Sequence, residues 1–158
     1  MALVKAYKLS KLNADGVSLV VVGRPAWNYQ EILEQISSTA GVTWLGFVSE
    51  EEKIALMQAA ELFVFPSLYE GFGFPVLEAM AAGTPVICSD RGSLSEVAGP
   101  ARRFEGLEAE TIADGLRDAL ADEAWRENVV DLGREWAKSF SWDASVESHL
   151  RIYRKLAR

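Results

Sequence analysis

Two glutamates, Glu70 and Glu78, flank a glycine-containing segment with the composition of a ligand-binding turn. This segment, residues 71–74, follows an apolar run typical of a strand, and a helix is expected from Pro75 onward. Glycines let backbone N–H groups approach a ligand closely, and a helix N-terminus offers unpaired N–H groups to phosphate. A carboxylate can accept hydrogen bonds from two vicinal hydroxyls. The pattern predicts a site for a phosphorylated, hydroxyl-rich ligand, although the helix dipole alone would also favour one acid here.

The surrounding sequence alternates apolar, β-branched runs with segments of helical periodicity. We expect strands at residues 17–22, 42–48, 62–66, 85–89 and 102–104, and helices at residues 2–12, 29–38, 49–60, 75–82, 93–98, 108–121, 122–138 and 142–157. The pattern Ser49-x-x-Glu52 predicts a capping box. The nearly continuous run at 17–22 predicts a buried parallel strand.

This alternation predicts a single α/β domain over residues 1–158, a Rossmann-like parallel sheet with helices on both faces. Such a domain ordinarily opens with a strand, whereas this chain opens with a helix. The first strand is therefore expected to be missing, so either the sheet is one strand short or another chain supplies that strand.

The composition of the chain argues against several classes of function and location. A net charge of −7 argues against a nucleic-acid partner. Cys88 is the only cysteine and lies in an apolar run, so we expect a buried, inert thiol and no disulfide. No apolar stretch is long enough for a membrane span and no signal peptide opens the chain, so a cytoplasmic location is expected.

Three other patterns favour structural roles. Asp114, Asp118 and Asp122 recur every four residues, which indicates a solvated helix face rather than a metal site. His149 is the sole histidine and has no nucleophile pattern around it. The five tryptophans are expected in the core or at its rim, at positions 27, 44, 125, 136 and 142.

A dinucleotide fingerprint competes for the glycine turn. Gly71 and Gly73 follow a strand, and Asp90 ends the next one near the place of a ribose-binding acid. However, Val76 stands at the third glycine position and Pro75 falls inside the turn. The match to an oxidoreductase is therefore weak, and this class stays as the least favoured alternative.

Residues 70–86 strongly resemble the donor-nucleotide-binding half of family 4 (group 1) retaining glycosyltransferases, which have the GT-B fold. The spacing Glu-x7-Glu, here Glu70 and Glu78, is the signature of that family. The similarity continues through residues 19–23, 44–49, 60–67, 93–97 and 140–145. Residues 23–27 look most like bacterial mannosyltransferase-type members.

The resemblance implies sugar transfer from a nucleotide diphosphate sugar with retention and without a metal or other cofactor. It implies that Glu78 holds the donor ribose and that Glu70 is a catalytic residue facing the sugar. The remaining implied contacts are main-chain groups: those of Gly71, Phe72, Gly73 and Phe74 for the sugar and phosphates, and those of Phe47 and Val48 for the base. An acceptor-binding domain or partner chain, and peripheral membrane association of the full enzyme, are also implied.

Two departures from the family pattern limit the expected activity. The acceptor half is absent, and so are the strand and loop whose Arg and Lys grip the diphosphate; only Arg24 or Arg91 could help. We therefore predict donor binding without turnover by this chain alone. The alternative is a non-catalytic module that associates with a separate chain or with itself through an apolar stripe at Val146, Leu150, Tyr153 and Leu156.

Overall fold

The computed structural model describes residues 2–25 and 29–157. The elements follow in the order α1 (Ala2–Ser10), η1 (Leu12–Asp15), β1 (Leu19–Val22), α2 (Gln30–Ser37), β2 (Val42–Gly46), α3 (Glu50–Ala59), β3 (Phe63–Phe65), α4 (Phe74–Ala82), β4 (Val86–Cys88), α5 (Leu94–Val97), β5 (Arg102–Arg103), α6 (Ala109–Ala121), α7 (Glu123–Lys138) and α8 (Trp142–Leu156). The predicted order of strands and α-helices is confirmed, including the helix that opens the chain, but the short 3-10 helix η1 was not predicted. Trp27 lies outside the described residues.

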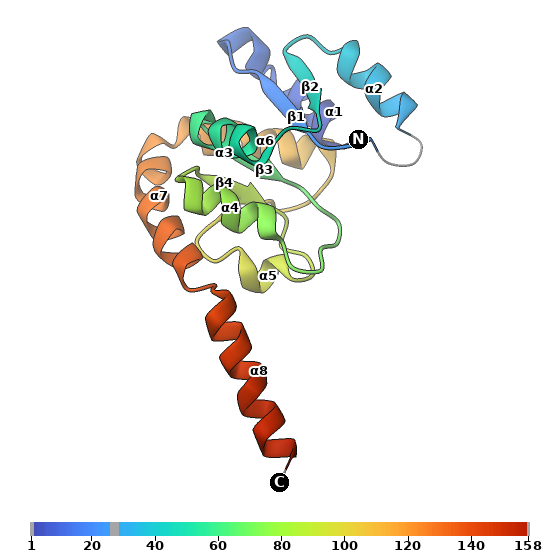
Figure 1. Cartoon of the computed structure of the whole chain (residues 1–158). Coiled ribbons are helices and arrows are strands. Elements are labelled where there is room, and N and C mark those ends of the chain that lie inside the picture. Colours follow the sequence, from blue (N-terminus) through green and yellow to red (C-terminus); the bar gives the residue numbers. More distant parts are fainter. Residues whose placement is uncertain (1, 26–28, 158) are drawn as a thin grey trace.

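The strands are parallel but form two sheets rather than the single sheet that we predicted. One sheet has the order β1-β2, and the other has the order β3-β4-β5. Figure 1 shows the first sheet with α1 and α2 in the blue and cyan part, above the sheet that carries α4 and α5. The edges of β1 and β3 are not hydrogen-bonded to each other.

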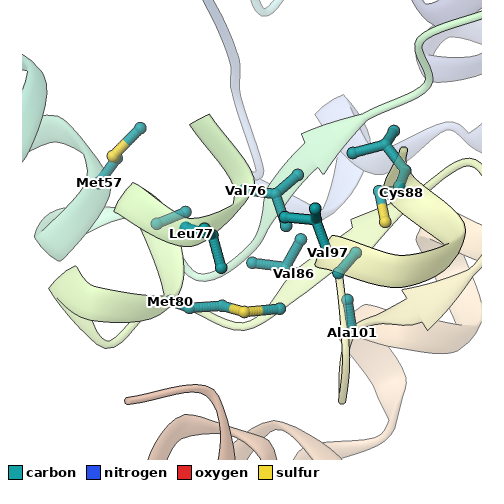
Figure 2. Close-up of a cluster of buried hydrophobic side chains, with 11 residues drawn as sticks. Met57, Val76, Leu77, Met80, Val86, Cys88, Val97 and Ala101 are labelled. Carbon is teal, nitrogen blue, oxygen red and sulfur yellow. The ribbon is translucent and has the colours of Figure 1, made fainter. Parts of the chain in front are cut away.

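Helices cover both faces of the three-stranded sheet, as predicted. Val86 and Cys88 of β4 belong to a buried cluster with α4 and α5, which Figure 2 shows at close range. The residue between them, Ile87, belongs to the opposite cluster with α1 and α6. Because successive side chains of a strand point to opposite faces, β4 is buried on both sides and carries the centre of the core.

The first sheet is buried on one face only, which corrects our prediction for residues 17–22. Leu19 packs into the core, whereas Val20 and Val22 are 45% and 41% exposed. Leu45 of β2 is 45% exposed as well. A β-branched run indicates a strand, but it does not say whether a second layer covers the outer face.

Helix α4 positions the glycine turn and Glu78. It begins after Gly73, which adopts φ 104°, and Pro75 occupies its first turn, where a missing N–H costs nothing. Val76 and Met80 lie on its buried face, so Glu78 is left on the flank of the helix. Burial of an apolar side chain of this size stabilises the fold by roughly 1.5–3 kcal/mol.

The C-terminal helix α8 projects from the rest of the chain, which it contacts at its beginning, at Trp142 (Figure 1). None of its residues is buried, and Figure 1 shows it (red) extending away from both sheets. Its apolar side chains are exposed, with Leu156 at 80%. Trp142 is 75% exposed, so the prediction that every tryptophan belongs to the core or its rim is wrong at this position.

Candidate functional site

The turn that carries Glu70 lies between the end of β3 and the start of α4, and two serines brace it. Ser67 Oγ donates a hydrogen bond of 2.7 Å to Oε1 of Glu70. Ser93 Oγ, from the segment that follows β4, lies 3.0 Å from the carbonyl oxygen of Glu70 and 2.8 Å from that of Phe72. The Glu70 carboxylate and the turn backbone are thereby held from two neighbouring strand ends.

The N–H groups of the turn point to no acceptor in the part of the chain that the structure describes. This holds for the four consecutive amides of Gly71, Phe72, Gly73 and Phe74. The next helical N–H, that of Val76, already donates to the carbonyl oxygen of Gly73 at 3.0 Å. Consecutive unpaired amides at a helix N-terminus form an arrangement that binds anions.

Glu78 lies on the second turn of α4 and forms an ion pair with α3. Lys53 Nζ is 3.0 Å from Oε1 of Glu78 and 2.8 Å from Oε2 of Glu50. Hydrogen bonds to Glu50 and then to Glu78 raise the pKa of Lys53 above its ordinary value. The ion pair brings the first turn of α3 beside the glutamate that follows the glycine turn.

Phe47 and Val48 precede Ser49, the N-cap of α3, and α3 is the helix whose Lys53 contacts Glu78. The predicted capping box is confirmed: Ser49 Oγ accepts from the N–H of Glu52 at 3.2 Å, and Glu52 Oε2 accepts from the N–H of Ser49 at 2.7 Å. The ring of Phe47 is exposed, and the guanidinium of Arg24 lies over it at 4.5 Å.

An aromatic cluster connects the glycine turn to the beginning of α8. The rings of Phe72 and Phe74 have centroids 4.6 Å apart. Phe140 meets Phe72 edge-on at 6.0 Å, and Trp142 stacks on Phe74 at 6.1 Å. The exposed Trp142 therefore caps the turn rather than filling the core.

The acidic residues Asp90, Asp114 and Asp122 have structural partners. Asp90 pairs with Arg103 at 3.4 Å, and Asp114 pairs with Arg117 on its own helix. Asp122 is more than part of a solvated face, because it caps α7 and pairs with Arg102 at 2.6 Å. The hydrogen bond from Arg102 is the main reason why the pKa of Asp122 is lowered.

Other predicted residues do not add to the site. Within residues 2–25 and 29–157, no three His, Cys, Asp or Glu side chains are grouped as metal ligands. His149 lies on the exposed α8, where Nδ1 is 2.8 Å from the carbonyl oxygen of Ser145. Burial raises the pKa of the Cys88 thiol to about 11, in agreement with the predicted inert cysteine.

Sequence reasoning missed Lys53, Ser67 and Ser93 as parts of the site. The spacing of Ser67 and Glu70, three residues apart, was the available signal for their hydrogen bond. For Lys53, the sequence offers only the pairing with Glu50 on the same helix. Its contact with Glu78 joins residues 25 positions apart and depends on the packing of α3 against α4.

Comparison with known proteins gives consistent results. The family model described as glycosyl transferases group 1 matches residues 2–136. O-antigen chain mannosyltransferase B of Escherichia coli is 34% identical over 98% of this chain and 42% of its own length. Phosphatidyl-myo-inositol mannosyltransferase of Mycobacterium leprae is 31% identical over 90% of this chain and 39% of its own length. The chain thus spans about two fifths of these relatives.

Solved structures agree with this similarity. Sucrose-phosphate synthase of Thermosynechococcus elongatus superposes with a TM-score of 0.79 at 29% identity, covering 98% of this chain and 42% of that chain. The C-terminal domain of the group 1 protein LpcC of Francisella tularensis gives a TM-score of 0.73 at 22% identity. The match covers 87% of this chain and 76% of that chain. Anabaena HepE in complex with UDP-glucose superposes with a TM-score of 0.78 at 23% identity. The match covers 99% of this chain and 44% of that chain. In the described part of the chain, no helix has the length and apolar character required to cross a membrane.

Proposed function

Because this chain belongs to the group 1 glycosyl transferases, we propose that it forms the donor-binding half of a retaining enzyme that transfers a sugar from a nucleotide diphosphate. Its α/β fold with parallel sheets is that of the C-terminal domain of GT-B glycosyltransferases. The observation that carries the proposal is the turn between Glu70 and Glu78, where four consecutive amides have no acceptor among residues 2–25 and 29–157.

Each part of the turn has a proposed partner on the donor. Glu78 accepts hydrogen bonds from the ribose hydroxyls, and the amides of residues 71–74 bind the diphosphate and orient the sugar. Glu70, which Ser67 and Ser93 brace, faces the donor sugar as the catalytic carboxylate. The main chain of Phe47 and Val48 borders the base. Both precede the N-terminus of α3, the helix whose Lys53 contacts Glu78, which supports this assignment.

The proposed donor class rests on the similar proteins. HepE binds UDP-glucose, and several relatives are mannosyltransferases, so we propose a hexose linked to a nucleotide diphosphate as the donor. Charge that develops on the departing diphosphate is compensated by the amides and the dipole of α4, without a metal ion. The acceptor and further cationic groups come from the rest of the enzyme, so we expect binding without turnover by this chain alone.

A thermal-shift panel of UDP, GDP, ADP and their hexose derivatives tests the proposal. A ligand at about a hundred times its dissociation constant adds about 2.7 kcal/mol of stability. Glu78→Gln should reduce the shift, because a neutral amide is a weaker acceptor for hydroxyls than a carboxylate. Glu147→Gln on the exposed α8 is the matched control and should behave as the wild type. No stabilisation by any nucleotide would refute a donor site.

The exposed α8 favours a second candidate function, a module that associates with another chain or with itself. Its apolar residues Val146, Leu150, Tyr153 and Leu156 are 43–80% exposed. Association would remove this surface from water, which is favourable in proportion to the apolar area buried. Sedimentation velocity over a wide concentration range tests this module, and a concentration-independent monomer would argue against self-association.

A further inference from the structure

Lys53 lies between two carboxylates, one of which is the glutamate proposed to hold the ribose. Its ammonium group is 3.0 Å from Oε1 of Glu78 on α4 and 2.8 Å from Oε2 of Glu50, one turn earlier on α3. The side chains of Lys53 and Glu78 are 25% and 38% exposed. The contact is therefore partly shielded from water while remaining open to a ligand.

We propose that Lys53 is a positioning residue that holds the Glu78 carboxylate in the orientation in which it accepts hydrogen bonds from the ribose, an inference that rests on the proposed function of this site. Lys53 occupies Oε1 of Glu78. No residue in 2–25 or 29–157 donates a hydrogen bond to Oε2. A carboxylate has about four lone-pair positions, so Oε2 and the second lone pair of Oε1 are left for two ribose hydroxyls.

Lys53 is itself well anchored for this role. It follows the capping box of α3, which fixes the first turn of the helix. Glu50 supplies the second anchor, and hydrogen bonds to the two carboxylates raise the pKa of Lys53, as expected for an ammonium group that both partners stabilise. The lysine thus forms a charged link between α3 and the Glu78 side of the turn.

A role in stability alone explains this arrangement less well. Partly exposed ion pairs contribute little to folding, so loss of the pair should hardly change the unfolding of the protein. Donor binding is different, because a free glutamate side chain loses rotamer freedom when a ligand orders it. Because Lys53 already orders the Glu78 side chain in the free protein, less rotamer freedom is lost when the ligand binds. Loss of Lys53 should therefore weaken ribose-dependent binding roughly three- to tenfold.

The test compares nucleotide binding by the wild-type chain and by Lys53→Met, which keeps the apolar stem. The probes are UDP or GDP, whichever stabilises the wild type, and its 2′,3′-dideoxy analogue. Lys53→Met should bind the ribonucleotide three- to tenfold more weakly and the dideoxy analogue with unchanged affinity. Lys53→Arg should restore most of the difference. Lys138→Met, which removes a lysine paired with Glu135 at 2.6 Å on α7, controls for net charge.

Three outcomes would overturn the inference. Equal weakening of both nucleotides by Lys53→Met would mean that the lysine acts on the phosphates or on the fold. If Glu78→Gln abolishes the preference for the ribonucleotide but Lys53→Met leaves it intact, the inference is wrong while the ribose-binding role of Glu78 stands. If Glu78→Gln leaves the preference intact, both the proposed role of Glu78 and the inference fail.

Discussion

Replacing Gly73 by alanine is a stringent test of the turn geometry. Gly73 adopts φ 104°, a conformation that L side chains rarely adopt. A Cβ atom at this position would lie 2.5 Å from Cδ2 of Leu94, and Leu94 is fully buried in the core beneath the turn. Two separate penalties therefore act at one residue, one from the backbone and one from packing.

The size of the effect follows from these penalties. A non-glycine residue in a sparsely populated backbone region costs about 1–3 kcal/mol. Insertion of a methyl group into a packed core costs about 1–3 kcal/mol more. Alanine also lowers the conformational entropy of the unfolded chain, which stabilises the folded protein by about 0.4–1 kcal/mol. The free energy of unfolding should therefore fall by about 2–5 kcal/mol, equivalent to a Tm lower by roughly 4–20 °C in a domain of this size.

Gly71→Ala provides the matched control within the same turn. Apart from its neighbours in the chain, no atom of the described residues lies within 4 Å of a Cβ atom at Gly71, and Gly71 does not have the positive φ of Gly73. Its free energy of unfolding should stay within about 1 kcal/mol of the wild type. Urea unfolding followed by tryptophan fluorescence measures both variants. Equal stability of Gly73→Ala and Gly71→Ala would refute the geometry described for the turn.

Three further predictions concern the scaffold. Ser49→Ala removes the cap of α3 and should lower the free energy of unfolding by about 1 kcal/mol. Ser141→Ala, at the start of the exposed α8, should lower only the helicity measured by circular dichroism. Equal losses of global stability in the two variants would contradict this prediction. The Cys88 thiol should resist a disulfide reagent in mildly alkaline buffer and react once urea unfolds the chain; rapid labelling of the native protein would contradict its burial. Because the pKa of Asp122 is lowered in the folded state, its stabilising effect is complete above the unfolded pKa and disappears as pH falls through the folded pKa. Asp122→Asn should therefore lower the Tm at neutral pH more than at strongly acidic pH, and an equal loss at both would count against the cap and ion pair.

Local signals in the sequence were sufficient to predict the elements and the turn. Gly73, Pro75 and Gly83 mark the limits of α4, and the structure places positive φ angles at both glycines. Ser49 and Glu52 predict the cap of α3. These features depend on residues a few positions apart, so their physical causes can be read from the sequence.

Features that depend on distant packing could not be predicted in the same way. The exposure of Val20 and Val22 depends on which layers cover β1, and a run of valines carries no such information. The ion pair of Lys53 with Glu78 requires α3 and α4 to pack side by side. The role of Trp142 depends on the direction of α8, which its own periodicity does not determine.

The two sheets are joined by side chains, since no backbone hydrogen bond connects β1 to β3. One hydrophobic cluster contains Tyr7 and Leu12 together with Ile87 and Ile112, and the partly buried Leu19 of β1 packs against it. Separation of the β1-β2 layer would disrupt this packing and leave the β3-β4-β5 ladder intact. The molecule should therefore open in two cooperative units, with the amide protons of β1 and β2 exchanging with solvent at a lower free energy than those of β3 and β4.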